Sequence, residues 1–174
     1  MCTERTPFGF IRKYDELALY FRDADHVDVK TIDCEKSLRG FISGMHAYNP
    51  WWIADLYRIR QVVARILGLV RHEAPGPAIR FRPEDIPFEP GKRVGLFTVR
   101  KAREDTYWVA EAPDDRHLTA AFGVVSEKLP GNVTRLHVFT SVKYRHWTGP
   151  VYFNLIRPFH HLIVWRMMKA GVRP

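Results

Sequence analysis

Near the C-terminus, a strand pattern stands directly before a long amphipathic helix pattern, and this pair most constrains the fold. Residues 133–145 alternate in character, and one strand face is formed by Leu136, Val138, Thr140, Val142 and Tyr144. This period of two predicts a strand with one face on a core and the other in water. Phe139 is a large apolar residue on the face that we expect to be wet.

We expect the helix to begin near Thr148, which suits an N-cap, with Pro150 in its first turn. At 3.6 residues per turn, one broad apolar stripe contains Val151, Tyr152, Leu155, Ile156, Phe159, Leu162, Ile163 and Met167. Pro158 lacks an amide hydrogen, so the helix either kinks there or starts there. Both versions present the same stripe, which must cover an apolar surface.

The first part of the chain predicts one strand followed by two helices. Residues 25–34 alternate with period two, and the two faces are formed by Val27, Val29 and Thr31 and by Asp28 and Lys30. From Glu35, apolar residues recur at helical spacing as far as Asn49-Pro50, and a second helical stripe then ends at Gly68. Residues 1–22 show no clear period, so we expect an arm or a loop there.

The second half of the chain predicts an antiparallel sheet. Residues 71–93 are rich in Pro and Gly, which predicts a connection with one short strand at 78–82. Further strand patterns occur at residues 94–103, 106–112, 117–128 and 133–145. The separators are short, which suits antiparallel hairpins better than crossover connections.

This order of elements predicts an α+β fold of the helix-grip type, in which an antiparallel sheet wraps around a long C-terminal helix and two helices follow the first strand. We expect a single domain over residues 1–174, with an N-terminal arm at 1–22 and the helix-grip core at 25–170. A chain of 174 residues, 46% of them hydrophobic, can bury such a core.

The charge of the chain permits several partners without selecting one. Lys and Arg number 27 against 19 Asp and Glu, the formal net charge is +8, and the cations are scattered. Such a surface attracts nucleic acid, anionic lipid or an acidic ligand. The two cysteines, Cys2 and Cys34, supply neither a disulfide framework nor a zinc spacing. Without a signal-peptide pattern or a stretch of about 20 apolar residues, we expect a soluble cytoplasmic protein.

Three segments resemble a known bacterial family. DHVDV at residues 25–29, DDRHL at 114–118 and TGPVYFNLIRPFHHLIV at 148–164 are similar to segments of the domain-of-unknown-function 2867 family, which has a DD-x-HL turn and a Pro-Phe-His helix. This resemblance carries no catalytic residue with it. The helix-grip order is also similar to START-like and birch-pollen-allergen-like proteins, which hold lipids, steroids or polyketides between sheet and helix and include cyclases and hydroxylase subunits.

The first hypothesis is therefore that the protein binds a small hydrophobic molecule, with or without an anionic group, between the sheet and the last helix. The expected ligand-binding residues are Leu136, Val138, Thr140, Val142, Tyr144, Tyr152, Ile156, Phe159, Ile163 and Arg166. Arg166 either extends to water along its aliphatic stem, which we prefer, or receives an anionic group of the ligand. A gap filled tightly by side chains would contradict this hypothesis.

The second hypothesis is a cyclase-like or dehydratase-like enzyme on the same scaffold. The residues that could face the cavity for acid/base chemistry are His117, His160 and Arg166, and Asp114, Asp115, His117 and His160 form a possible polar site. Asp114, Asp115 and His117 have the composition of a tight turn, and we expect His160 at the border of the apolar stripe and His161 at the surface near Arg157. Adjacent helical residues point about 100° apart, so the two histidines cannot chelate one metal. No catalytic, P-loop, dinucleotide or zinc motif occurs, so no catalytic residue, cofactor or metal is predicted.

The third hypothesis is a basic module that contacts an anionic membrane surface or a protein. The run YNPWW at residues 48–52 most simply wedges the two helices against each other. Exposure of Trp51 or Trp52 beside Arg58, Arg60 and Arg65 would favour the membrane instead. No nucleic-acid-binding motif occurs, so no specific nucleic-acid partner is expected. The sequence predicts no particular oligomeric state.

Overall fold

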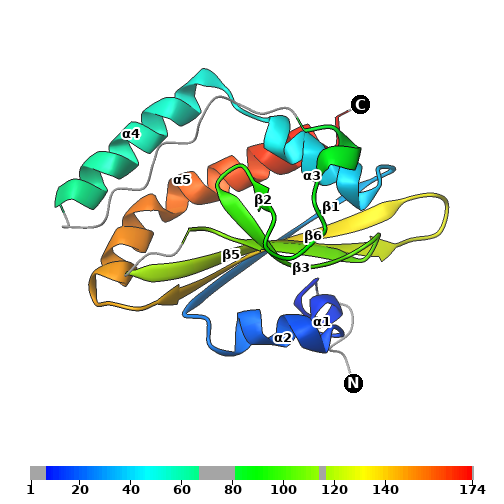
Figure 1. Cartoon of the computed structure of the whole chain (residues 1–174), viewed down its shortest axis with the longest axis horizontal. Coiled ribbons are helices and arrows are strands. Elements are labelled where there is room, and N and C mark those ends of the chain that lie inside the picture. Colours follow the sequence, from blue (N-terminus) through cyan, green and yellow to red (C-terminus); the bar gives the residue numbers. More distant parts are fainter. Residues whose placement is uncertain (1–6, 67–80, 114–116, 174) are drawn as a thin grey trace.

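The computed structural model describes residues 7–66, 81–113 and 117–173 and contains one antiparallel sheet (Figure 1). Within these residues the sheet has six strands in the order β1-β6-β5-β4-β3-β2. They are β1 (His26–Cys34), β2 (Arg93–Val94), β3 (Phe97–Arg103), β4 (Tyr107–Glu111), β5 (Leu118–Lys128) and β6 (Thr134–Tyr144). The short strand expected at 78–82 and the helix end expected at Gly68 lie largely outside the described residues.

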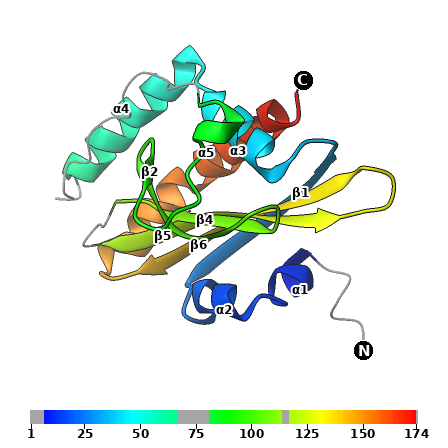
Figure 2. The same cartoon turned by 45° about the vertical axis from the view of Figure 1, so that its right-hand side comes forward.

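Helices cover both faces of the sheet, as Figures 1 and 2 both show. One face, which we name the α5 face, carries α3 (Leu38–Ala47), α4 (Trp51–Ile66), α5 (Thr148–Gly171) and the 3-10 turn η2 (Pro83–Asp85). The opposite face, the α1 face, carries α1 (Pro7–Ile11) and α2 (Asp15–Arg22). The predicted α+β helix-grip fold is therefore confirmed, with an additional layer on its outer side.

The long hairpin of β5 and β6 forms the centre of the sheet. Val124 pairs with Val138 in its register. The turn places Gly131 at φ 76° and Asn132 at φ 55°. Gly adopts this left-handed region freely and Asn tolerates it, so the PGN separator can close the hairpin. Strand β1 pairs with the other side of β6 and forms an edge of the sheet.

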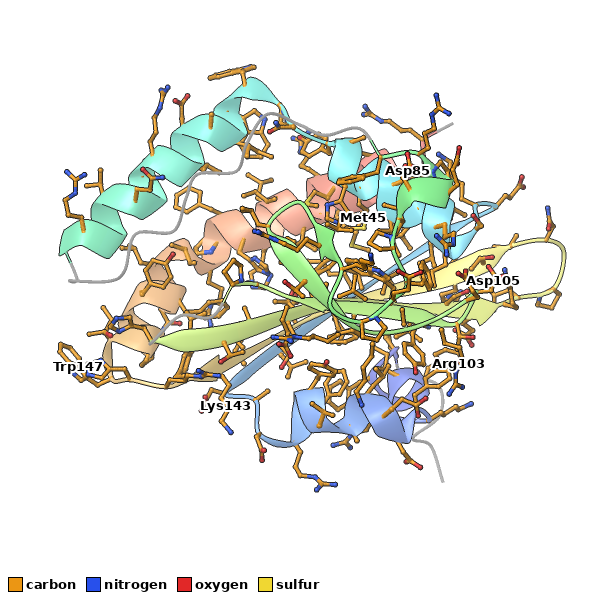
Figure 3. All side chains as sticks on the ribbon, in the orientation of Figure 1. Met45, Asp85, Arg103, Asp105, Lys143 and Trp147 are labelled. Carbon is orange, nitrogen blue, oxygen red and sulfur yellow. The ribbon has the colours of Figure 1, made fainter. Side chains whose placement is uncertain are left out.

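The larger hydrophobic core lies on the α5 face, where α3 and α5 meet. Its side chains with at most 1% exposure include Phe41, Met45, Leu136, Val138 and Met168. Met45, labelled in Figure 3, points from α3 into this core. A Cβ atom on Gly171 would lie 2.7 Å from the Phe41 ring, so α3 and α5 approach closely at this glycine. Burial of each large side chain contributes about 1.5–3 kcal/mol.

The expectation of an N-terminal arm is wrong for the described part of that segment. The helices α1 and α2 cover the sheet and bury Ile11, Leu17, Tyr20 and Phe21 together with Phe139 of β6. Their lengths of 5 and 8 residues are too short for a helical period to be recognised. The available signal was Phe139, because a large apolar residue on a supposedly wet face needs a cover.

The orientation expected for the last helix is wrong for half of the apolar stripe. Helix α5 runs without interruption through Pro158, but four members of the expected stripe, Val151, Leu155, Phe159 and Leu162, are 43–54% exposed. Tyr152 of the stripe is buried as expected, and Ile156, Ile163 and Met167 are half-buried. The other large buried side chains of α5 are Phe153, Val164 and Met168, which the stripe did not include. His160 also points inward, toward Thr140 of the sheet. The expected stripe contained only apolar residues, so it did not include this polar residue of the inner face.

Candidate functional site

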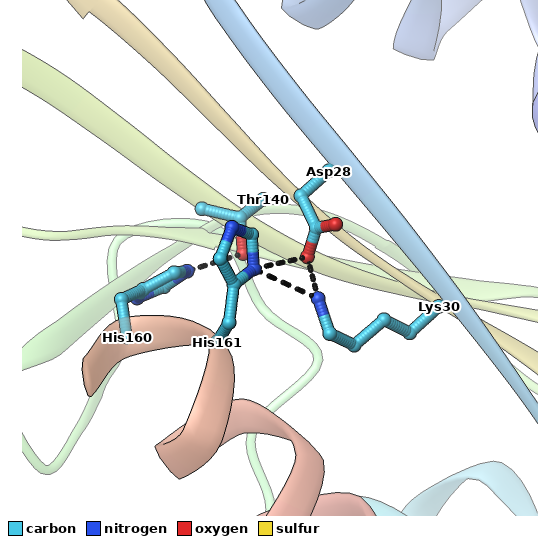
Figure 4. A network of polar contacts seen from close by, with 5 residues as sticks. All are labelled: Asp28, Lys30, Thr140, His160 and His161. Carbon is cyan, nitrogen blue, oxygen red and sulfur yellow. Dashed lines mark hydrogen bonds and ion pairs between the residues drawn. The ribbon is translucent and has the colours of Figure 1, made fainter. Parts of the chain in front are cut away.

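A polar cluster lies between β1 and α5 on a face of the sheet that is otherwise largely apolar (Figure 4). Strand β1 contributes Asp28 and Lys30, β6 contributes Thr140, and α5 contributes His160 and His161. Alternation along β1 turns its even-numbered residues toward α5, while the neighbouring valines pack on the α1 face. The fold thus joins Lys30 and His161, which are 131 positions apart.

Asp28, Lys30 and His161 converge on one another. The Lys30 ammonium donates to the Asp28 carboxylate, and its Nζ lies 3.0 Å from Nδ1 of His161. The same Nδ1 is 3.2 Å from Oδ2 of Asp28. This nitrogen can accept from Lys30 when it carries no proton, or donate to Asp28 when it does. When Nδ1 accepts, Lys30 uses two of its three ammonium hydrogens in its contacts with the described residues.

Electrostatics keep the Asp28 carboxylate charged. Burial raises its pKa, but the hydrogen bond and charge of Lys30, followed by those of His161, outweigh the burial and hold the pKa below its usual range. The carboxylate is therefore ionised at neutral pH. It anchors the ammonium group of Lys30 on the inner side of the edge strand.

His160 and His26 are the neutral members of this site. Burial, followed by the charges of His161 and Lys30, lowers the pKa of His160 to about 4. Its Nε2 lies 3.2 Å from the Thr140 hydroxyl. Burial, followed by Arg157 and His161, also lowers the pKa of His26, whose ring lies 4.9 Å from that of Phe153. The Nε2 atom of His26 is inaccessible to water and has no hydrogen-bond partner among the described residues.

Most of this cluster was not predicted from the sequence. His161 was expected at the surface and His160 at a border of the stripe, whereas both rings reach the sheet. Asp28 and Lys30 were identified only as one face of a strand. The missed signal was the spacing His-x-Asp-x-Lys at residues 26–30, which puts three ionisable groups on one face of β1.

A second neutral histidine, His46 of α3, lies on the same face near β3 and β4. The rings of Phe81, Phe97 and Trp108 surround it with centroid distances of 6.1–6.3 Å. Burial lowers the pKa of His46 to about 4, and its buried Nε2 has no hydrogen-bond partner within the described ranges. The α5 face therefore holds unpaired imidazole nitrogens near two different parts of the sheet.

The expected ligand-binding residues occupy three kinds of position. Leu136 and Val138 are buried in the core beneath the C-terminal half of α5, so side chains fill that part of the interface. Thr140, Val142 and Tyr152 are buried and Tyr144, Ile156 and Ile163 half-buried closer to the polar cluster. Phe159 and Arg166 are exposed. A ligand-binding role for these residues stays a prediction, and Lys30, rather than Arg166, is the cation in the polar cluster.

The expected turn site is described only in part. Asp114 and Asp115 lie outside the described residues. His117 is described, and its Nδ1 lies 2.5 Å from the Thr148 hydroxyl, which is also 2.9 Å from Nδ1 of His146. Thr148 therefore links the start of β5 to the start of α5. It is the first residue of the helix, and Trp147, not Thr148, holds the N-cap position. The structure brings together Thr140 and His160 of the predicted residues, but His117 belongs to this separate contact.

The chemistry of the cluster suits an organic polar group better than a metal ion. In the portion of the chain that is described, no three His, Cys, Asp or Glu side chains are grouped to hold a metal. The Lys30 ammonium sits against both Asp28 and His161, where it would repel a cation. An acceptor such as a carboxylate or carbonyl oxygen is complementary to this arrangement.

Comparison with protein families matches residues 20–167 to the family described as "Protein of unknown function (DUF2867)". The chain belongs to this DUF2867 family. The match includes β1 and almost all of α5, the two elements that carry the polar cluster. No curated protein sequence matches the chain.

Solved structures give weaker likenesses to this DUF2867 protein. The Mll3558 protein from Rhizobium loti aligns with a TM-score of 0.42 at 12% identity, covering 84% of this chain and 96% of the other. The hypothetical protein jhp0584 from Helicobacter pylori gives 0.42 at 10%, covering 88% and 91%. Norcoclaurine synthase from Thalictrum flavum gives 0.40 at 10%, covering 84% of each chain. At these scores the likenesses contribute nothing to the functional argument.

Proposed function

We propose that this DUF2867 protein binds a small, largely hydrophobic molecule between the sheet and α5, with a polar or anionic group of that molecule at the cluster around Lys30. The observation that carries this proposal is the set of Lys30, neutral His160 and unpaired His26 on one inner face. Polar groups on such a face cost stability unless they are paired. A bound acceptor supplies the missing partner.

The donors of the site define the chemistry of the polar group. Lys30 retains one ammonium hydrogen, and a neutral imidazole can either donate or accept through its Nε2. A carboxylate, sulfonate or carbonyl oxygen can accept from both. Phe153 against His26 and the half-buried Ile156 and Ile163 supply apolar contacts beside this group. The ligand class supported best is therefore an apolar molecule with an oxygen acceptor at one end.

The first test uses the fluorescent probe 8-anilinonaphthalene-1-sulfonate, which has apolar rings and one sulfonate. We expect saturable binding of one probe per chain. Lys30→Met should weaken it about tenfold, which corresponds to about 1.4 kcal/mol, because a charge-assisted hydrogen bond is lost. Lys143→Met is the matched control, because Lys143 lies on the same sheet but is exposed on its α1 side. Equal affinities in the two variants would overturn this assignment of the polar end.

Native mass spectrometry followed by denaturing extraction identifies the natural molecule. We expect an apolar adduct on the wild-type protein and a reduced one on Lys30→Met. Thermal unfolding of the wild type and of Lys30→Met shows whether the adduct is lost only because the variant is unfolded. An adduct retained in full by a folded Lys30→Met variant would contradict the proposed binding mode.

A second candidate function, acid/base chemistry on the bound molecule, is favoured by the contact between Asp28 and His161. A carboxylate that holds one ring nitrogen orients the imidazole, and such an imidazole can transfer protons through its other nitrogen. If the protein converts its ligand, His161→Gln should co-purify with a molecule whose mass differs from that bound by the wild type. Identical bound molecules, unchanged on prolonged incubation, would exclude this activity.

A further inference from the structure

Exposed large hydrophobic side chains are concentrated on α4 and α5. Ten such residues are exposed among the described ones, and nine of them belong to these helices or immediately precede α5. They are Trp51, Ile59, Val62, Trp147, Val151, Leu155, Phe159, Leu162 and Trp165. The tenth, Leu19, lies on α2 across the sheet. We name the nine residues the apolar surface.

The apolar surface consists of regular stripes. On α5, Val151, Leu155, Phe159, Leu162 and Trp165 follow one another at intervals of three or four residues, which places them on one helix face. Helix α4 lies along the outer side of α5 in both views and contacts it (Figures 1 and 2). The exposed residues of both helices remain open to solvent, so neither helix covers the stripe of the other.

Cations accompany these stripes. Helix α4 contains Arg58, Arg60 and Arg65 against the single carboxylate of Asp55, and α5 contains Arg157, Arg166 and Lys169 with no carboxylate. Arg58, Arg65, Arg157, Arg166 and Lys169 are exposed. The two helices therefore combine exposed apolar side chains with a strong excess of positive charge.

Exposed tryptophans lie at three points of the apolar surface. Trp51 begins α4 with 81% exposure, and Trp147 precedes α5 with 72% exposure and points away from the fold in Figure 3. Trp165 is exposed beside Lys169, whose Nζ lies 5.0 Å from the ring centroid. Tryptophan favours the boundary between hydrocarbon and water, because its ring is apolar and its N–H is polar.

We propose that the α4–α5 side of the protein docks on an anionic membrane surface. Cations attract the lipid head groups, and the apolar stripes enter the outer edge of the hydrocarbon. No helix in the described ranges is long and apolar enough to cross a membrane, so the contact is peripheral. A second copy fits this surface poorly, because it would bring the same positive charges together. Nucleic acid offers no hydrocarbon to the aliphatic stripe.

Flotation with lipid vesicles tests the docking. We expect the protein to bind phosphatidylglycerol vesicles and not phosphatidylcholine vesicles, and to dissociate as salt shortens the range of the electrostatic attraction. The double variant Leu155→Ser/Leu162→Ser should reduce the bound fraction at least several-fold. Leu19→Ser, an equally exposed leucine on the other side, should leave it unchanged. Both leucines of the double variant are exposed, so folding should persist, and thermal unfolding checks this.

Three results of the flotation experiment would overturn the proposal. They are no vesicle binding at low ionic strength, equal binding to the two lipids, and equal losses of binding in the two leucine variants. A wild-type dimer that the double variant dissociates would assign the surface to a second copy. A protein partner that binds the apolar surface in the absence of any vesicle binding would assign it to that partner. Binding of the anilinonaphthalene probe by the double variant is expected to persist, which separates this test from that of the ligand site.

Discussion

His137 and His160 lie on opposite faces of the sheet, and they differ in how many of their ring nitrogens have partners among the described residues. His137 of β6 faces α1 and is 2% exposed. Its Nδ1 lies 3.1 Å from the Thr31 hydroxyl, its Nε2 lies 2.9 Å from Glu127, and the Phe10 ring covers it at 5.1 Å. Both ring nitrogens have fixed protein partners, so this histidine completes a closed structural network.

His160 lies on the other side of the sheet, where its Nε2 shares a hydrogen bond with the Thr140 hydroxyl, the one that it makes among the described residues. Its neighbour His26 has a buried ring nitrogen without a partner in the described part of the chain, and Lys30 has a hydrogen to spare. Both ring nitrogens of His137 thus have partners on the α1 face, whereas Nε2 of His26 on the α5 face has none among the described residues. This difference supports the proposed ligand site on the α5 face.

The largest expected effect tests whether the α1 face is a closed core. Phe139→Ala should lower the free energy of unfolding by about 4 kcal/mol, because it leaves a cavity beside Tyr20 and Phe21. Phe159→Ala, on the exposed side of α5, should lower it by less than about 1 kcal/mol. Urea denaturation measures both values. Equal losses would show that the two helical layers seal the sheet to the same degree.

The pH dependence of stability should separate the two histidines next. The folded pKa of His160, about 4, lies below the unfolded value of about 6.5, so its contribution is present above pH 6.5 and is lost as the pH falls toward 4. This loss is up to about 3 kcal/mol, and His160→Gln should remove it. Burial also lowers the pKa of His137, but Glu127 opposes the shift.

The matched variant His137→Gln should therefore change the pH dependence less than His160→Gln does. The measurement is the free energy of unfolding of wild type and both variants at several values between pH 7 and pH 4, each relative to its own value at pH 7. If His137→Gln altered the pH dependence of the free energy of unfolding more than His160→Gln did, His137 and not His160 would be the histidine with the more strongly lowered pKa.

The smallest expected effect compares the two hydroxyl partners. Thr31→Val leaves Nδ1 of His137 without its hydrogen-bond partner in a closed site and should cost about 1–2 kcal/mol in unfolding free energy. Thr140→Val should cost less than about 1 kcal/mol, because His160 is only half-buried and is less enclosed than His137. Thr140→Val should, however, change the affinity for the anilinonaphthalene probe, whereas Thr31→Val should not change that affinity. The opposite pattern in unfolding and probe titrations would contradict the comparison.

Much of the fold could be predicted because its signals are local. The alternation in residues 133–145 and 25–34 identified β6 and β1, and the short separators identified antiparallel hairpins. The polar cluster was harder to predict, because it depends on contacts between β1 and α5 across 131 positions. The sequence predicts Thr140 and His160 as candidate site residues, but their association with Asp28 and Lys30 depends on the register of the edge strand β1 against β6.

The sequence by itself determined the periods of the strands and helices, since an alternation of two or a repeat near 3.6 is a property of neighbouring residues. Only the tertiary structure decided which side of each element is inside. Phe139 became buried because α1 and α2 fold beneath the sheet, and His160 became an inner residue because α5 turns the stripe of Leu155 and Phe159 outward. The physical reason is that burial depends on what packs against a face, and that partner comes from a distant part of the chain.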